Sequence, residues 1–148
     1  MSDLMRRIET FRETGDTTGM TDAIPYSRFL GVSLLRDEEG LLGKLTYSDH
    51  LVGNPELPAL HGGTIGALLE MTAIFQLLWE AETLVLPKTI NITVQYLRSA
   101  RPIDTYARSI ITKRGRRVVT ARVEAWQDDP ARPVAMANAH FLVIGKDP

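Results

Sequence analysis

The sequence contains no cysteine, and only three of its 148 residues are histidines, at His50, His61 and His140. The absence of cysteine excludes disulfides, thiolate-bound zinc, iron–sulfur clusters and a cysteine nucleophile. Three histidines without any cysteine also leave no recognisable zinc motif. We therefore predict that the protein has no metal site. Its cysteine-free composition fits a reducing cytoplasm.

The sequence also has no large excess of positive or negative charge. The chain has 17 Lys and Arg against 18 Asp and Glu, which gives a net charge of −1. Bulk electrostatics therefore give no reason to expect a nucleic-acid or membrane partner. The first seven residues carry charges at Asp3, Arg6 and Arg7 and lack the apolar core of a signal peptide. We predict a cytoplasmic protein.

One apolar run, from Gly62 to Trp79, reaches roughly the length of a membrane span. Glu70 in its middle and Gln76 after it argue against a span, and a run that is apolar all round indicates a buried helix. An unpaired carboxylate is costly to bury. Glu70 therefore either faces solvent, pairs with a cation such as Arg98, or lies in a cleft where chemistry uses it.

The length and the 44% hydrophobic content predict one globular domain. Apolar residues recur at helical spacing from Ser2 to Thr14 and predict a short amphipathic helix. The polar stretch Gly15–Thr21 predicts a loop. We assign residues 1–20 to this helix and loop, and residues 21–148 to the main domain.

Most other segments have strand character. Val32–Arg36 and Leu41–Tyr47 flank a turn and predict a hairpin, and a loop over Ser48–Leu60 leads to the helix at Gly62–Glu82. Four further strands follow, with alternating apolar residues from Ile90, Ile103, Val119 and Ala135 onward. We predict an α+β fold in which an antiparallel six-stranded sheet wraps around one long buried helix, about 30 Å in length.

Several segments resemble the hotdog-fold acyl-CoA thioesterases, in particular their phenylacetate-degradation (PaaI-like) branch. The resemblance covers nearly all of the chain after the first twenty residues. It is carried by Pro25–Val32, by His61-Gly62-Gly63 followed by the acid Glu70, and by Tyr96–Ala100 at a strand end. Gly115-Arg116 and the alanine-rich last strand also fit.

The resemblance implies that the protein hydrolyses acyl-CoA thioesters to free acid and coenzyme A. It implies that two subunits pair edge to edge, with active sites at the interface of a homodimer or of a dimer of dimers, a homotetramer. It also implies that no cofactor is needed, because coenzyme A belongs to the substrate. The acyl group stays open.

By the same resemblance, Glu70 is the catalytic carboxylate, either as general base on water or as the nucleophile. The Gly62 backbone N–H polarises the thioester carbonyl at the start of the helix. Asn54 orients water or the carbonyl, or is an ordinary turn residue before Pro55. Thr89 reaches the site from the second subunit, or is simply a β-branched strand residue.

The expected substrate-binding residues are His61 and Gly63, which would line the site, and the three arginines Arg98, Arg114 and Arg116. Coenzyme A carries phosphates, which arginine binds well. The alternative for these arginines is a solvated turn and charge protection of a sheet edge.

Two other functions stay open. A hotdog acyl-thioester dehydratase or hydratase also uses a histidine and an acid, but the Pro- and Phe-flanked segment of such enzymes is missing around His61. A non-catalytic acyl-CoA-binding protein is the second. Sensors of that kind usually carry a DNA-binding module, and residues 2–14 are too few for a helix-turn-helix.

Overall fold

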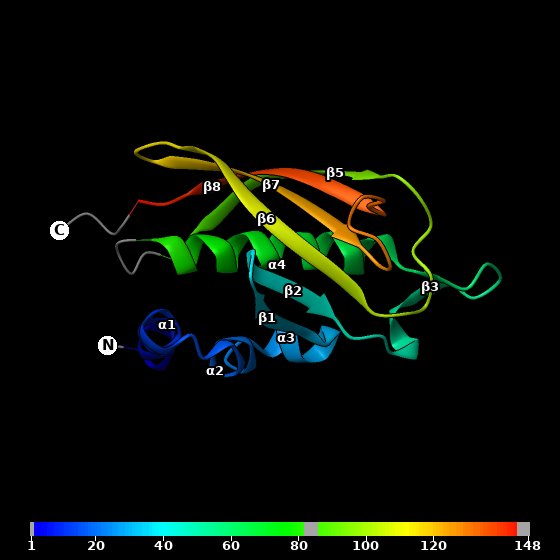
Figure 1. The fold of residues 1–148 in the computed structure, drawn as a ribbon, viewed down its shortest axis with the longest axis horizontal. Helices are drawn as coiled ribbons and strands as arrows, with labels where there is room; N and C mark the ends of the chain where they lie inside the picture. The colour runs from blue at the N-terminus through cyan, green and yellow to red at the C-terminus, as the bar shows by residue number, and fades with distance from the viewer. Residues whose placement is uncertain (1, 82–85, 145–148) are drawn as a thin grey trace.

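A six-stranded antiparallel sheet forms the main body of the computed structural model, which describes residues 2–81 and 86–144. The strands are β1 (Val32–Asp37), β2 (Gly40–Leu45), β5 (Lys88–Tyr96), β6 (Thr105–Arg114), β7 (Val118–Trp126) and β8 (Ala135–Leu142), in the order β1-β2-β6-β7-β8-β5. Figure 1 shows the sheet curling around helix α4 (Gly62–Glu80), with β5, β7 and β8 on one side and β1 and β2 on the other. The predicted α+β architecture is confirmed.

The inner face of the sheet is built from small and branched residues. Every second residue is buried along β7, from Val119 to Ala125, and along β8, from Ala135 to Phe141. Alanines at most of these positions let α4 lie close to the sheet. On β2, Gly43 serves the same purpose, because a Cβ there would come within 2.2 Å of the Thr72 hydroxyl on α4.

Strand β5 departs from the predicted alternation at one point. Its pairing with β8 shifts register between Thr89 and Asn91, which places one extra residue in β5. Ile90 is therefore 52% exposed, whereas Ile92 packs against the core. The prediction that both isoleucines share one face is wrong, because a bulge reverses the facing of the residues before it.

Helix α4 is the core helix of the fold. It begins at Gly62 as predicted and ends at Glu80, two residues before the predicted end. Its side chains at Leu68, Leu69 and Leu77 belong to the main hydrophobic core. By length and apolarity alone α4 meets the requirement of a membrane span, but 56% of its most apolar window is buried inside the protein, as in a core helix.

Three short helices cover the end of α4. They are α1 (Asp3–Thr14), α2 (Thr17–Asp22) and α3 (Pro25–Leu30). The prediction of α1 is confirmed, whereas the predicted loop over Gly15–Thr21 contains most of α2. The Asp16 side chain accepts hydrogen bonds from two backbone N–H groups and caps α2.

A second hydrophobic cluster fixes these helices to the domain. Ile8 and Phe11 of α1 and Met20 of α2 are buried against Phe75 and Leu78 of α4. Met20 is the apolar residue that anchors α2, and one such residue in a polar stretch is too weak a pattern to predict a helix.

The segment before α4 is more ordered than the predicted loop. It contains a 3₁₀ turn at Asp49–Leu51 and a small antiparallel pair, β3 (Val52–Asn54) with β4 (Ala59–Leu60). The His61 N–H donates to the Leu51 carbonyl at 2.8 Å, so this segment holds the start of α4. Leu57, in the turn between β3 and β4, is 71% exposed.

Candidate active site

The first turn of α4 presents one backbone donor without a partner. The His61 imidazole Nδ1 accepts a hydrogen bond from the Gly63 N–H at 2.8 Å and caps the helix. In the described part of the chain, no hydrogen bond involves the Gly62 N–H. Gly62 therefore fits the role of carbonyl-polarising donor, whereas the Gly63 N–H is already engaged. His61 is therefore the N-cap residue of α4.

Tyr96 holds the Gly62 peptide from the neighbouring strand. Its hydroxyl donates to the Gly62 carbonyl at 2.7 Å. A Cβ added at Gly62 would lie 3.1 Å from the tyrosine ring, a contact tight enough that the ring would have to move slightly. The sequence analysis missed this role of Tyr96, although the residue lies in the Tyr96–Ala100 segment that carries the family resemblance.

Gly62 opens onto a cavity of about 390 Å³ between the start of α4 and the end of β5. Tyr96, Arg98 and Ser99 also line this cavity. Arg98, from the predicted set of cationic residues, therefore lines the same cavity as Gly62.

Glu70 lies two turns further along α4, half-buried and facing a different cavity of about 440 Å³. It is the only charged residue in the lining, which is otherwise apolar except for Tyr26. Within residues 2–81 and 86–144, Glu70 makes no ion pair and no side-chain hydrogen bond. Pairing with Arg98, the alternative considered from the sequence, is not found there.

Asp37, at the end of β1, is by contrast a carboxylate with a cationic partner. Its side chain accepts a hydrogen bond from Arg108, which holds the pKa of Asp37 below its usual value. Asp3 is likewise paired with Arg7 and Arg6. A carboxylate without such a partner, beside an apolar cavity, is available for chemistry.

Gly62 and Glu70 of one chain do not meet at a single point. Eight residues of α-helix separate them by about 12 Å along the helix axis. They also line different cavities. A reacting carbonyl must lie about 3 Å from both its donor and the attacking group, so one chain by itself does not bring the two together.

Comparison with known proteins decides the family. The model of the thioesterase superfamily matches residues 57–134, the stretch that contains Gly62, Glu70 and Tyr96. The chain belongs to the thioesterase superfamily. The resemblance to hotdog-fold thioesterases is thereby confirmed, and the enzyme class predicted from the sequence, a thioester hydrolase, is the class of this superfamily.

Individual proteins that are similar to this chain cover between 81% and 99% of it. A medium/long-chain acyl-CoA thioesterase, YigI, from Salmonella typhimurium is 30% identical over 135 residues, covering 81% of this chain and 86% of that protein. A crystal structure of a Chromobacterium violaceum protein has 38% identity and a TM-score of 0.78, covering 96% of this chain and 99% of that one. A Bacillus halodurans protein crystallised with CoA shares the fold, with a TM-score of 0.74 at 16% identity, covering 99% of this chain and 97% of that one.

The other residues that were predicted for the site lie in separate parts of the fold. Asn54 ends β3, where its side-chain oxygen accepts from the N–H groups of Glu56 and Leu57 and forms a turn. It lines neither the Gly62 cavity nor the Glu70 cavity. Thr89 lies opposite the fully buried Phe141, so its side chain points to the α4 side of the sheet.

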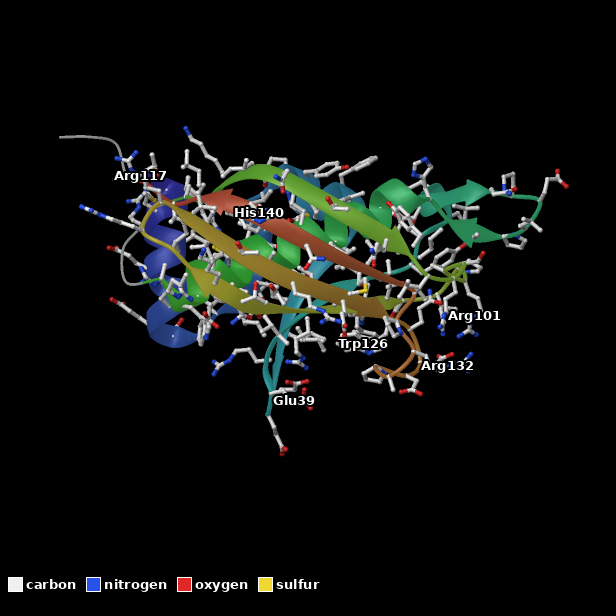
Figure 2. The ribbon with its side chains drawn as sticks, turned by 90° about the horizontal axis from the view of Figure 1, so that it is seen from above. Glu39, Arg101, Arg117, Trp126, Arg132 and His140 are labelled. Carbon is white, nitrogen blue, oxygen red and sulfur yellow. The ribbon has the colours of Figure 1, made fainter. Side chains whose placement is uncertain are left out.

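Thr89 and two of the predicted arginines lie toward the far end of α4. Thr89 is near the beginning of β5, seven residues before Tyr96. Arg114 pairs with Glu80, the last residue of α4, at 2.5 Å, about 27 Å from Gly62 along the helix. Arg116 lies in the following turn with Arg117. Figure 2 shows Arg117 at one end of the sheet and Arg101, after β5, at the other.

In the described ranges, no group of three or more His, Asp or Glu side chains is close enough to hold a metal ion. The groups that line the two cavities include the Gly62 backbone, the Glu70 carboxylate and the Arg98 side chain.

Proposed function

We propose that the protein hydrolyses acyl-CoA thioesters to a free acid and coenzyme A. The observation that carries the proposal is Glu70, an unpaired carboxylate beside an apolar cavity on the helix whose first N–H is unoccupied. Membership of the thioesterase superfamily and the 30% identity to an acyl-CoA thioesterase support the same reaction.

The chemistry takes one of two routes through Glu70. As general base, the carboxylate takes a proton from water while the water oxygen attacks the thioester carbonyl carbon. The C–S bond then breaks, and the coenzyme A thiolate leaves and takes up that proton. As nucleophile, Glu70 attacks the carbon itself and expels the thiolate, and water then hydrolyses the mixed anhydride. On both routes the Gly62 N–H stabilises the negative charge that develops on the carbonyl oxygen.

A second copy of the chain completes the site in this proposal. Strand β5 is a nine-residue edge strand with Ile90 52% exposed and Tyr96 56% exposed. A long apolar edge strand favours pairing with another strand. Pairing β5 with β5 of a second copy would extend the sheet across a homodimer and bring each Glu70 cavity, which Ile92 and Val94 of β5 also line, to the interface.

The two-fold symmetry of such a dimer would gather the dispersed residues. Paired antiparallel, each β5 runs opposite to its copy, so the far end of one subunit lies beside the near end of the other. Thr89, Arg114 and Arg116 of one subunit would then approach Gly62 and Arg98 of the other. Glu70 would likewise act on a carbonyl held by Gly62 of the other subunit, which removes the 12 Å separation within one chain.

In this arrangement the arginines would contact the coenzyme A part of the substrate. Arg98 beside Gly62, with Arg114 and Arg116 from the second subunit, would bind the phosphates of coenzyme A. The carbonyl would be held near the helix start, and the reaction needs no cofactor beyond the coenzyme A of its substrate. A dimer of dimers would repeat this unit, in the cytoplasm, without changing the site.

The test is thiol release from a panel of acyl-CoAs by the wild type and by Glu70→Gln. We expect turnover by the wild type and a loss of kcat of about 10²–10⁴-fold in the variant. Glu80→Gln is the matched control, because Glu80 lies on the same helix, paired with Arg114, and should leave kcat unchanged. Full activity of Glu70→Gln, or no thiol release by the folded wild type, would overturn the proposal.

A further inference from the structure

The cavity at Glu70 is an apolar groove that follows α4. Its α4 lining runs from Gly66 to Phe75, about 14 Å along the helix axis. Toward the start of α4, Gly66 and Ala67 are small residues that leave space beside Glu70. Toward the end of α4, Ile74 and Phe75 have large side chains. A volume of about 440 Å³ lies within the ~300–1,000 Å³ of ligand pockets.

The two walls beside α4 are apolar as well. Ile92 and Val94 of β5 form one, and Ile24, just before α3, forms the other together with Tyr26. Beyond Glu70 and the Tyr26 hydroxyl, the lining side chains offer no hydrogen-bonding group apart from the weakly accepting sulfur of a methionine. A ligand segment in this groove therefore gains free energy from apolar contact and has no partner there for a polar substituent.

The far end of the groove is closed by the N-terminal helices. Phe75 is 1% exposed and belongs to the cluster that includes Phe11 of α1 and Met20 of α2. Ile24 and Ile74 pack against the same cluster. The end wall is therefore supported by packed core side chains, which resist displacement by a ligand.

We infer that this groove binds the acyl chain of the substrate, an unbranched aliphatic chain, and that Ile74 limits its length. The inference rests on the proposed function, because the reacting carbonyl must lie at Glu70. From there the chain extends along α4 toward Ile74, with Ile24 opposite and Phe75 behind. The N-terminal helices thus help set the substrate, besides covering α4.

The test is the chain-length profile of kcat/KM for straight-chain acyl-CoAs from butanoyl to palmitoyl, with benzoyl-CoA and phenylacetyl-CoA alongside. Ile74→Ala should move the optimum to longer chains, with a gain of about fourfold for each further methylene that the enlarged groove buries. Ile74→Phe should move the optimum to shorter chains. If Ile74 had only a structural role, its substitution would lower kcat/KM for every substrate by the same factor, and the chain-length profile would keep its shape.

Ile110→Ala is the matched control, since Ile110 is 63% exposed on β6 and does not line the groove. Its profile should equal that of the wild type. Profiles of unchanged shape in both Ile74 variants would overturn the inference, as would a preference of the wild type for the aromatic substrates.

Measurements of binding distinguish failure of the proposed function from failure of this inference. If the wild type hydrolyses none of the panel, the Kd of each acyl-CoA is measured by calorimetry for the wild type, Ile74→Ala and Ile74→Phe. Opposite shifts of the Kd profile in the two variants would support the groove without hydrolysis. A Kd that does not change with chain length would overturn the inference.

Discussion

The two halves of α4 have opposite properties. In the first half, Gly62, Gly63 and Gly66 leave the helix surface open, and two cavities adjoin it. In the second half, Phe75 and Leu78 are buried in the cluster of the N-terminal helices. One continuous helix thus carries the candidate reactive groups, Gly62 and Glu70, in the half that adjoins the cavities, and it packs against the N-terminal helices in the other half.

The end of the second half is held by further contacts. The Trp79 ring lies 4.9 Å from that of Phe11, and the Arg36 guanidinium lies 4.9 Å from the Trp79 ring. Glu80 pairs with Arg114 and accepts a hydrogen bond from Gln76. Such contacts fix the second half of the helix, whereas Ile65, Leu68 and Leu69 hold the first half in the main hydrophobic core. Substitutions should therefore affect activity in one half and stability in the other.

The largest effect in the first half is expected from Gly62→Val. The side chain would collide with the Tyr96 ring and shift the Gly62 N–H, which should lower kcat about 10²–10³-fold. Ile110→Ala is again the control, because Ile110 is exposed on β6 and lines neither the Gly62 cavity nor the Glu70 cavity. The kcat of both variants is compared by thiol release. Equal kcat in both would contradict a role for the Gly62 amide.

In the second half, Phe11→Ala should act on stability. Phe11 is fully buried against Phe75, Leu78 and Trp79, and its truncation should cost about 3–5 kcal/mol of unfolding free energy. Urea denaturation measures this loss. For the folded fraction, kcat on a short-chain acyl-CoA should stay at the wild-type value. A large fall of kcat without a change in stability would abolish the contrast between the halves.

Tyr96→Phe should have an intermediate effect in the first half. It removes the hydrogen bond to the Gly62 carbonyl, which contributes about 1 kcal/mol, while the ring stays in place. We expect kcat to fall by about fivefold with little change in KM. Steady-state kinetics test this, and a change in KM alone would mean that Tyr96 contacts substrate instead of positioning the amide.

Arg114→Ala should have the smallest effect on stability. The Arg114–Glu80 pair is nearly half exposed on both sides and contributes about 0–1 kcal/mol. In the proposed dimer, however, Arg114 binds a phosphate, so KM should rise and its dependence on salt should weaken. Kinetics at two ionic strengths test this. An unchanged KM at low salt would remove Arg114 from the substrate site.

The sequence predicted the elements with strong patterns. The apolar run of α4 and the alternation from Val119 to Ala125 need only local residues to be recognised, and both predictions are confirmed. The bulge at Ile90 and the helix α2 were missed. The bulge depends on how β5 pairs with β8, and α2 depends on the tertiary burial of Met20. The local sequence pattern shows neither the strand that pairs with β5 nor the residues that bury Met20.

The candidate site was predicted as a set of residues at a subunit interface, without the distances between them within one chain. The cost of burying an unpaired charge singled out Glu70, and its helix-start position singled out Gly62. No sequence pattern revealed that the two line different cavities, or that Arg98 and Arg114 lie at opposite ends of α4. Such distances follow from helix rise only once the boundaries of α4 are known.

The central claim, a site shared between two copies, is tested most directly by mixing two inactive variants. Glu70→Gln and Gly62→Val are unfolded together and refolded in equal amounts, and thiol release is measured. If Gly62 of one subunit serves Glu70 of the other, each mixed dimer regains one intact site, and roughly a quarter of wild-type activity returns. If the mixture stays as inactive as either variant although mixed dimers form, both groups act within one chain and the claim is wrong.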